Sequence, residues 1–282
     1  MKPSLRSAAA ITLLLSASAH AQPGTLDPLF GTGGWLGLDG AGTILTVETA
    51  YDMEVQPDGR IVMVGYFADQ KALVRCLPNG SLDASFGTGG VADLNVALAG
   101  PVWNIALQPD GKILLTSSTF DGVQARLAVV RYLPNGTLDI TFGGDGIAEV
   151  TIGTDTSEGY DVTVQDDGKI VVAGQSVENA LYSATTVRFM PNGTVDTGFS
   201  GDGVVQWTEN GDETVRSVAI QADGRILVAG AVPTAPGVYD AFVLRYMPNG
   251  TPDNTFGTNG AVTLDIGSQD DFTRVLLQPD GK

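Results

Sequence analysis

Hydrophobic and polar residues alternate along a short segment that precedes an Asp-Gly pair in five places. In the first copy Met53 and Val55 alternate with polar residues. The counterparts in the later copies are Ile105 and Leu107, Val162 and Val164, Val218 and Ile220, and Val275 and Leu277. A period of two is typical of a strand with one face against a core. The pattern therefore predicts a half-buried strand at each of these places.

The turns and apolar runs between these segments predict further strands. A nearly unbroken apolar run follows the Asp-Gly pair, as in residues 170–173, and is typical of a strand buried on both faces. Asp-Gly favours a tight hairpin because both turn positions prefer positive φ, and Pro-Asn-Gly marks a second turn. One more strand is predicted after a Gly-rich segment, as in residues 203–207. No segment of useful length has a helical period, so the chain is predicted to be all-β.

These elements belong to a tandem repeat. The phrase QPDGRIVMVG begins at residue 56, and related phrases begin at residues 108, 165, 221 and 278, at spacings of 52, 57, 56 and 57 residues. Four short strands in about 56 residues are typical of one propeller blade, whereas an immunoglobulin-like sandwich needs about 100 residues. We therefore predict a β-propeller with four complete blades and a truncated fifth. The units span residues 26–81, 82–137, 138–194, 195–251 and, in part, 252–282.

The repeated phrases also resemble a known family. PNGxLDxxFG followed by QPDGKIVVAG resembles the delta-60 repeat, a bacterial tandem repeat of the domain-of-unknown-function β-propellers. The resemblance implies a propeller fold and export from bacteria, and it implies no activity or catalytic residues. The DGxIxVAG part is similar to repeats of NHL and lactonase-like propellers. The enzymes among those propellers place carboxylates and a histidine in a central channel.

The first 21 residues have the layout of a secretory signal peptide. Lys2 and Arg6 precede an apolar run over residues 8–15, and Ala19 to Ala21 offers a small-residue cleavage site. We expect residues 1–21 to be removed and residues 22–282 to form the repeat array. The mature protein would then be periplasmic, cell-surface or extracellular. No later apolar stretch reaches the roughly 20 residues of a membrane span, so no membrane insertion is expected.

Charge and the rare residue types exclude several functions. The chain has 32 acidic and 15 basic residues, a net charge of −17, which disfavours binding to nucleic acid or anionic lipid. Cleavage would remove the only histidine, His20, and with it any Ser-His-Asp or Cys-His nucleophile and any His-ligated metal. Cys76 is the only cysteine, so no internal disulfide is possible. Because the other units have an aromatic residue at this position, we interpret Cys76 as a core residue.

Arginine and aspartate recur eight residues apart in every complete unit. The pairs are Arg75 and Asp83, Arg131 and Asp139, Arg188 and Asp196, and Arg245 and Asp253. A guanidinium and a carboxylate at this offset are suited to pair across the Pro-Asn-Gly turn or between blades. A single asymmetric ligand cannot use all copies, so we expect these residues to be structural.

The variable segments between the fixed phrases are the candidate binding face. If successive strands alternate in direction, residues 153–160, 208–215 and 265–272 lie at one end of the propeller with residues 117–125, 175–184 and 231–240. Variable loops on a rigid scaffold commonly carry binding sites. The first set is acidic, with Asp155, Glu158, Glu209, Asp212, Glu213, Asp270 and Asp271 as weak candidates for ligand or Ca²⁺ binding. The alternative is that these acids are simply solvated.

Three functions fit these observations. The first is an exported, non-catalytic scaffold that binds a protein or a glycan, for which Trp207, Tyr182 and Tyr239 offer aromatic surfaces. The second is a hydrolase or lyase that uses carboxylates in the channel. Its candidate acids, Asp39, Asp93, Glu149 and Asp265, lie near the strand expected to be innermost. The third is a structural spacer. Because the fifth unit stops within a hairpin, we expect free strand edges and self-association of the chain when expressed alone.

Overall fold

A computed structural model describes residues 26–30, 49–67, 70–94, 96–267 and 269–278. The predicted signal peptide, residues 1–21, and the candidate acid Asp39 lie outside these residues. Sixteen strands form four antiparallel sheets of four strands each, in the orders β1-β2-β3-β4, β5-β6-β7-β8, β12-β11-β10-β9 and β13-β14-β15-β16. The described residues contain no helix and therefore no helical membrane span.

The strand bounds follow the repeat. The first sheet contains β1 (Thr49–Val55), β2 (Ile61–Phe67), β3 (Gln70–Cys76) and β4 (Val91–Asp93), and the second contains β5 (Ile105–Leu107), β6 (Ile113–Phe120), β7 (Ala125–Tyr132) and β8 (Ile147–Val150). The third contains β9 (Ser157–Val164), β10 (Ile170–Glu178), β11 (Leu181–Phe189) and β12 (Val204–Trp207), and the fourth contains β13 (Thr214–Ile220), β14 (Ile226–Ala235), β15 (Val238–Tyr246) and β16 (Ala261–Leu264). Each sheet takes its fourth strand from the following sequence unit.

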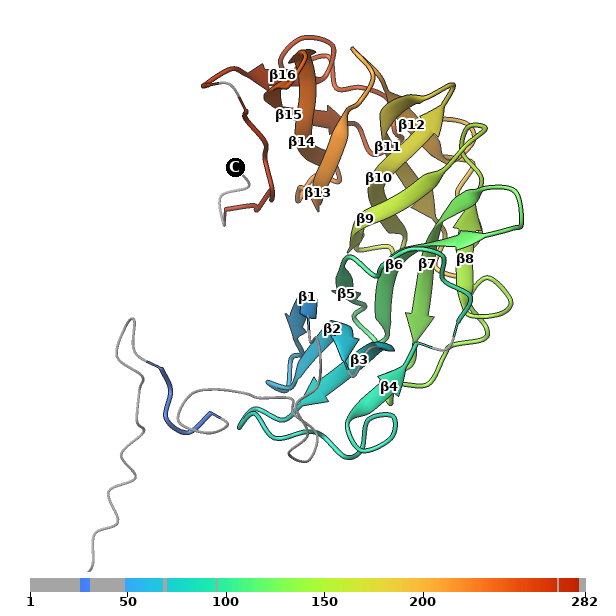
Figure 1. Ribbon diagram of the computed structural model, residues 1–282, viewed down its shortest axis with the longest axis vertical. Helices are drawn as coiled ribbons and strands as arrows, with labels where there is room; N and C mark the ends of the chain where they lie inside the picture. The colour runs from blue at the N-terminus through green and yellow to red at the C-terminus, as the bar shows by residue number, and fades with distance from the viewer. Residues whose placement is uncertain (1–25, 31–48, 68–69, 95, 268, 279–282) are drawn as a thin grey trace, which may run out of the picture.

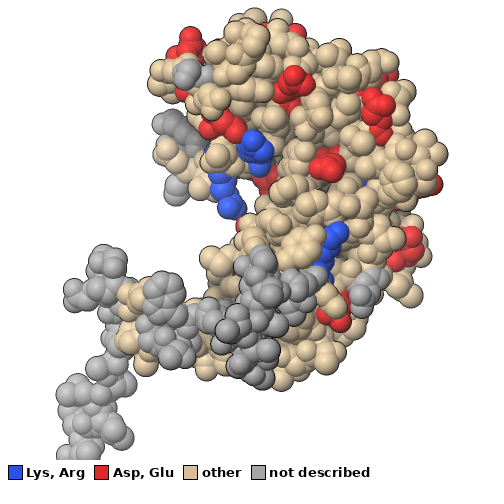
Figure 2. Space-filling model, in the orientation of Figure 1, with Lys and Arg blue, Asp and Glu red and all other residues tan. Residues whose placement is uncertain are grey.

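The four sheets are arranged as blades in an arc around a central opening (Figures 1 and 2). Inner strands of successive blades contact one another, β1 with β5, β5 with β9, and β9 with β13. The predicted β-propeller architecture is therefore confirmed. Residues 271–278 form no strand, so a fifth blade is not confirmed in the described part of the chain.

One expectation about the blades was wrong. The strand after the Gly-rich segment was expected to face the axis, but these strands (β4, β8, β12 and β16) lie at the outer edge of each sheet (Figure 1). Asp93 and Glu149 are therefore on the outside of the propeller, and Asp265 follows the outer strand β16. The sequence predicts the order of strands within a sheet, but that order is the same whichever edge faces the axis.

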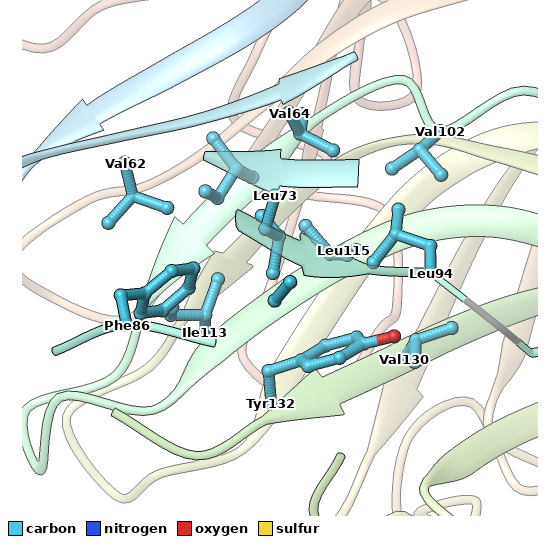
Figure 3. Packing of buried hydrophobic residues seen from close by; sticks show 12 residues of the cluster. Val62, Val64, Leu73, Phe86, Leu94, Val102, Ile113, Leu115, Val130 and Tyr132 are labelled. Atoms are coloured by element: carbon cyan, nitrogen blue, oxygen red, sulfur yellow. The ribbon is translucent and has the colours of Figure 1, made fainter. Parts of the chain in front are cut away.

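The core lies between neighbouring blades. Val62, Val64 and Leu73 of the first blade pack against Ile113 and Leu115 of the second, and all are buried (Figure 3). In the third blade, Val171 and Val172 are adjacent and fully buried, yet they belong to clusters on opposite faces of the sheet. This confirms the prediction that the apolar runs form strands buried on both faces.

A repeated cluster connects each blade to the next. Arg75 Nε lies 2.9 Å from Asp83 Oδ2, while Arg75 Nη1 donates a hydrogen bond of 2.5 Å to the Pro134 carbonyl in the second blade. The Arg75 guanidinium also lies 4.5 Å from the centre of the Phe86 ring. Gly136 packs on that ring with φ of +84°, where an added Cβ would come within 3.0 Å of ring carbons. Arg131 and Arg188 make the same contacts, to the carbonyls of Pro191 and Pro248.

Candidate functional site

Equivalent polar residues on, or next to, the inner strands connect successive inner strands at the axis. Asp52 Oδ2 accepts a hydrogen bond of 3.1 Å from the Ile105 amide of the next blade. Asn104 Oδ1 accepts one of 3.4 Å from the Val162 amide, and Asp161 Oδ2 accepts one of 2.7 Å from the Val218 amide. Ser217 and Arg274 occupy the same repeat position in the fourth and fifth units. Three of the five copies therefore serve the scaffold.

The position just before these residues is aromatic in the first three blades. The Tyr51 and Trp103 ring centres are 5.8 Å apart and the Trp103 and Tyr160 centres are 5.7 Å apart, both in edge-to-face geometry. Tyr51 is 39% exposed. The fourth and fifth units have Arg216 and Thr273 here. The inner strands and the residues just before them thus present an aromatic row followed by polar groups.

Two cavities lie along the axis beside these residues. The loop-side cavity, of about 330 Å³, is lined by Tyr51, Asp52, Trp103, Asn104, Tyr160, Asp161, Val215, Arg216, Ser217, Thr273 and Arg274. The turn-side cavity, of about 400 Å³, is lined by Glu54 and by residues 104–107, 161–164, 217–220 and 274–277. Four lining residues are common to both cavities, namely Asn104, Asp161, Ser217 and Arg274. The two cavities are therefore adjacent.

Two carboxyl groups at these cavities hold their protons more tightly than usual. Burial raises the pKa of Asp161 although the amides of Val218 and Val162 donate hydrogen bonds to it. Burial also raises the pKa of Glu54, and the charge of Asp52 adds to that effect while Arg274 opposes it. Raised carboxyl pKa values are a common property of functional sites, although structural sites also show them.

The variable segments lie together at one end of the blades. In the third blade Trp207 pairs with Ala184 and Ser157 pairs with Ser176, so the segments that follow β10 and β12 and that precede β9 are at the same end. The candidate acids Asp155, Glu209 and Asp212 lie in loops at this end, while Glu158 lies within β9. The Asp-Gly turns are at the opposite end.

Several candidate acids are used by their own loops. Glu213 is fully buried, and its Oε1 accepts hydrogen bonds from the amides of Glu209, Asn210 and Gly211. Asp270 does the same one unit later, because its Oδ2 accepts from the amides of Ile266 and Gly267. These carboxylates fix the loop conformation.

One group of acids has a geometry that would suit a cation. Carboxylate oxygens of Asp240, Asp265 and Asp270 lie within 4.8 Å of one another, and Asp265 is exposed. Only Asp270 of this group was among the candidates for Ca²⁺ binding. Ca²⁺ binding at the acidic loops stays a prediction.

The aromatic row was missed by the sequence analysis. The aromatic residues that it named lie elsewhere: Trp207 packs on Phe242 at 4.9 Å, and Tyr182 and Tyr239 lie on β11 and β15. The available clue was position, since Tyr51, Trp103 and Tyr160 each stand five residues before the glutamine of the repeated phrase.

The comparisons with known proteins concern the fold. No curated protein sequence gives a significant match. A protein of unknown function from Dyadobacter fermentans is 11% identical over 76% of this chain and 64% of that protein, with a TM-score of 0.47. A gluconolactonase from Xanthomonas campestris is 11% identical over 81% of this chain and 65% of that enzyme, with a TM-score of 0.44.

A third similar structure is the extracellular domain of a putative one-component system from B. thetaiotaomicron. It is 10% identical over 82% of this chain but only 25% of that protein, with a TM-score of 0.43. This chain thus spans less than two thirds of each of these proteins. At such identities and TM-scores these likenesses carry no argument about function.

A family model gives the decisive comparison. The model described as "Domain of unknown function (DUF5122) beta-propeller" matches residues 56–86, 108–142, 165–199 and 221–256. Each match begins at the repeated phrase before an Asp-Gly turn and extends to the phenylalanine that packs beside the arginine. The matches therefore cover the same part of each of the four repeats, and the chain belongs to the DUF5122 β-propeller repeat family.

Proposed function

We propose that this chain is the binding module of an exported bacterial protein, that the loop-side cavity is its ligand site and that the ligand is a glycan. The observation that carries the proposal is the aromatic row. Tyr51 lies on β1, Trp103 just before β5 and Tyr160 on β9; Trp103 contacts the other two rings edge to face, and all three line one cavity. Export is supported by the signal-peptide layout of residues 1–21.

The size and lining of the cavity suit a small polar ligand. A volume of about 330 Å³ is at the lower end of the range for ligand sites, which is roughly 300–1,000 Å³. Aromatic rings supply rigid apolar surface for the carbon faces of a sugar. Asn104, Ser217 and Thr273 supply hydrogen-bonding groups for its hydroxyls. The net charge of −17 supports this ligand over nucleic acid or an anionic membrane surface.

Titration calorimetry with a panel of defined oligosaccharides tests the proposal. Trp103→Ala should weaken binding at least tenfold, because the central ring of the row is lost. Tyr182→Ala is the matched control, since Tyr182 is also aromatic and 40% exposed but lies on β11 and does not line the cavity. Unchanged binding by a folded Trp103→Ala variant would refute the assignment of the site. If no oligosaccharide binds the wild-type chain, the spacer hypothesis becomes the better one.

A second candidate function is carboxylate-dependent hydrolysis or elimination in the same channel. The observation that favours it is that Glu54 and Asp161 both line the turn-side cavity and both have raised pKa values, as a general acid requires. Release of reducing ends from a bound oligosaccharide would support this function, provided that Glu54→Gln abolishes it. If the chain binds an oligosaccharide without cleaving it, the non-catalytic binding module remains the better explanation.

A further inference from the structure

The repeat is broken twice by arginine, at neighbouring positions of the loop-side cavity. Arg216 stands where the first three blades have aromatic residues, and Arg274 stands where four units have Asp52, Asn104, Asp161 and Ser217. Arginine has no acceptor atom, so Arg274 cannot accept the interstrand hydrogen bond that Asp52, Asn104 and Asp161 accept. Residues that leave the repeat pattern are free to serve one asymmetric ligand. Arg216 and Arg274 are therefore candidates for binding a ligand.

Both guanidinium groups keep donors available for a ligand. Arg216 Nε is paired with Asp271 Oδ2 at 3.0 Å, but within the described parts of the chain its two terminal nitrogens have no hydrogen-bond partner. The Arg274 guanidinium likewise has no hydrogen-bond partner there. The segment that carries Arg274 is nevertheless attached to the fourth blade, because the Asp270 amide donates a hydrogen bond of 2.8 Å to the Tyr239 carbonyl.

The acids beside these arginines are largely occupied by the backbone. Asp161 accepts amide hydrogen bonds at both oxygens, from Val162 at Oδ1 and from Val218 at Oδ2, and burial raises its pKa. Asp52 uses one oxygen for the Ile105 amide. Among the described residues that line the cavity, the charged donors that remain open are therefore guanidinium nitrogens. Basic side chains also gather around the central opening on the face shown in Figure 2, although the chain as a whole is strongly acidic.

We propose that the loop-side cavity selects a sugar that carries a carboxylate, with the sugar ring on the aromatic row and the carboxylate on Arg216 and Arg274. Two guanidinium groups match this ligand because their planar fork donates paired hydrogen bonds to carboxylate oxygens. A neutral sugar would leave the terminal nitrogens of Arg216 and the Arg274 guanidinium without an anion to hydrogen-bond. The inference rests on the proposed glycan-binding function and names the class of glycan.

The experiment compares two trisaccharides that differ only in their acid groups, trigalacturonate and its carboxyl-reduced form, by titration calorimetry on the mature chain. Wild type should prefer the acidic form at least tenfold. Arg216→Gln and Arg274→Gln should each weaken binding of the acidic form by about tenfold or more, as expected for a lost hydrogen bond to a charged group, and leave the neutral form unchanged. Arg126→Gln is the matched control, because Arg126 pairs with Asp121 and Glu149 away from the axis.

The outcomes separate this inference from the proposed function. Equal affinity of wild type for the two trisaccharides would overturn the selection of an acid, while loss of both in Trp103→Ala would keep the glycan site. Equal weakening of both trisaccharides by the arginine variants would also overturn the selection of an acid, provided that the variants unfold at the wild-type temperature. If neither trisaccharide binds wild type, the acidic-sugar inference fails, and the oligosaccharide panel then decides the proposed function.

Discussion

Replacing Arg131 with alanine tests whether the arginine cluster holds adjacent blades together. Arg131 Nε lies 2.9 Å from Asp139 Oδ2, and the two side chains are only 6% and 4% exposed. Arg131 Nη1 donates a hydrogen bond of 2.6 Å to the Pro191 carbonyl of the next blade, and the guanidinium lies 4.2 Å from the Phe142 ring centre. Removing one partner of a buried ion pair leaves the other charge uncompensated, which costs about 3–5 kcal/mol. We expect Arg131→Ala to lower the free energy of unfolding by that amount.

Arg245→Ala is a control within the same protein. Arg245 makes the equivalent ion pair with Asp253 at 2.8 Å and lies 4.4 Å from the Phe256 ring centre. Its side chain is 21% exposed, and no carbonyl of a further blade accepts from it within the described residues. Asp253 also keeps a second partner, since Arg225 Nε lies 2.9 Å away. The loss on substitution should therefore be smaller, about 1.5–3 kcal/mol, as for loss of a hydrogen bond to a charged group.

Urea denaturation followed by circular dichroism gives both values, provided that the slope with denaturant is the same for wild type and variants. Arg126→Ala measures the effect of removing a partly exposed arginine, and it should cost no more than about 1 kcal/mol. Equal losses for Arg131→Ala and Arg245→Ala would show that contacts within one blade account for the cluster. A loss below about 1 kcal/mol at Arg131 would refute the reasoning.

Burial alone would raise the pKa of Asp139, but hydrogen bonds from Thr141 and the charge of Arg131 outweigh it and lower the pKa. The stability advantage of wild type over Asp139→Asn should thus be present above the unfolded-state pKa of about 3.9 and be lost as pH falls through the folded-state value, which denaturation at a series of pH values measures. Cys76 is fully buried, and burial raises the pKa of its thiol. A thiol reagent should therefore label Cys76 only after unfolding, and labelling of the folded protein would contradict its core position. Because no carbonyl of a further blade accepts from Arg245 within the described residues, we propose that the isolated chain self-associates, and a monomer at every concentration in sedimentation would contradict this.

The sequence by itself determined the strands, the turns and their repetition. Strand and turn formation depends on residues nearby in the sequence. Examples are the alternation around Val162 and Val164, the apolar run after Gly168 and the Pro-Asn-Gly triplets, which predict strands and turns without reference to any other blade. Gly136 illustrates the point, because the positive φ of +84° in its Pro-Asn-Gly turn favours glycine whatever the neighbouring blade does. Local pairing also determined that the variable loops share one end, since antiparallel strands reverse direction at every hairpin.

Only the tertiary structure decided which strand faces the axis, and with it the site. Trp103 is 52 residues from Tyr51 and 57 from Tyr160, and nothing in the sequence near any of them shows that blade stacking brings their rings together. The converse applies to the acids. The sequence indicated Glu213 as a candidate ligand, but the structure shows that it is buried and accepts hydrogen bonds from its own loop. The physical reason is that strand formation depends on neighbouring residues, whereas the lining of the axis depends on how whole sheets pack. The sequence pattern is the same for either inward edge.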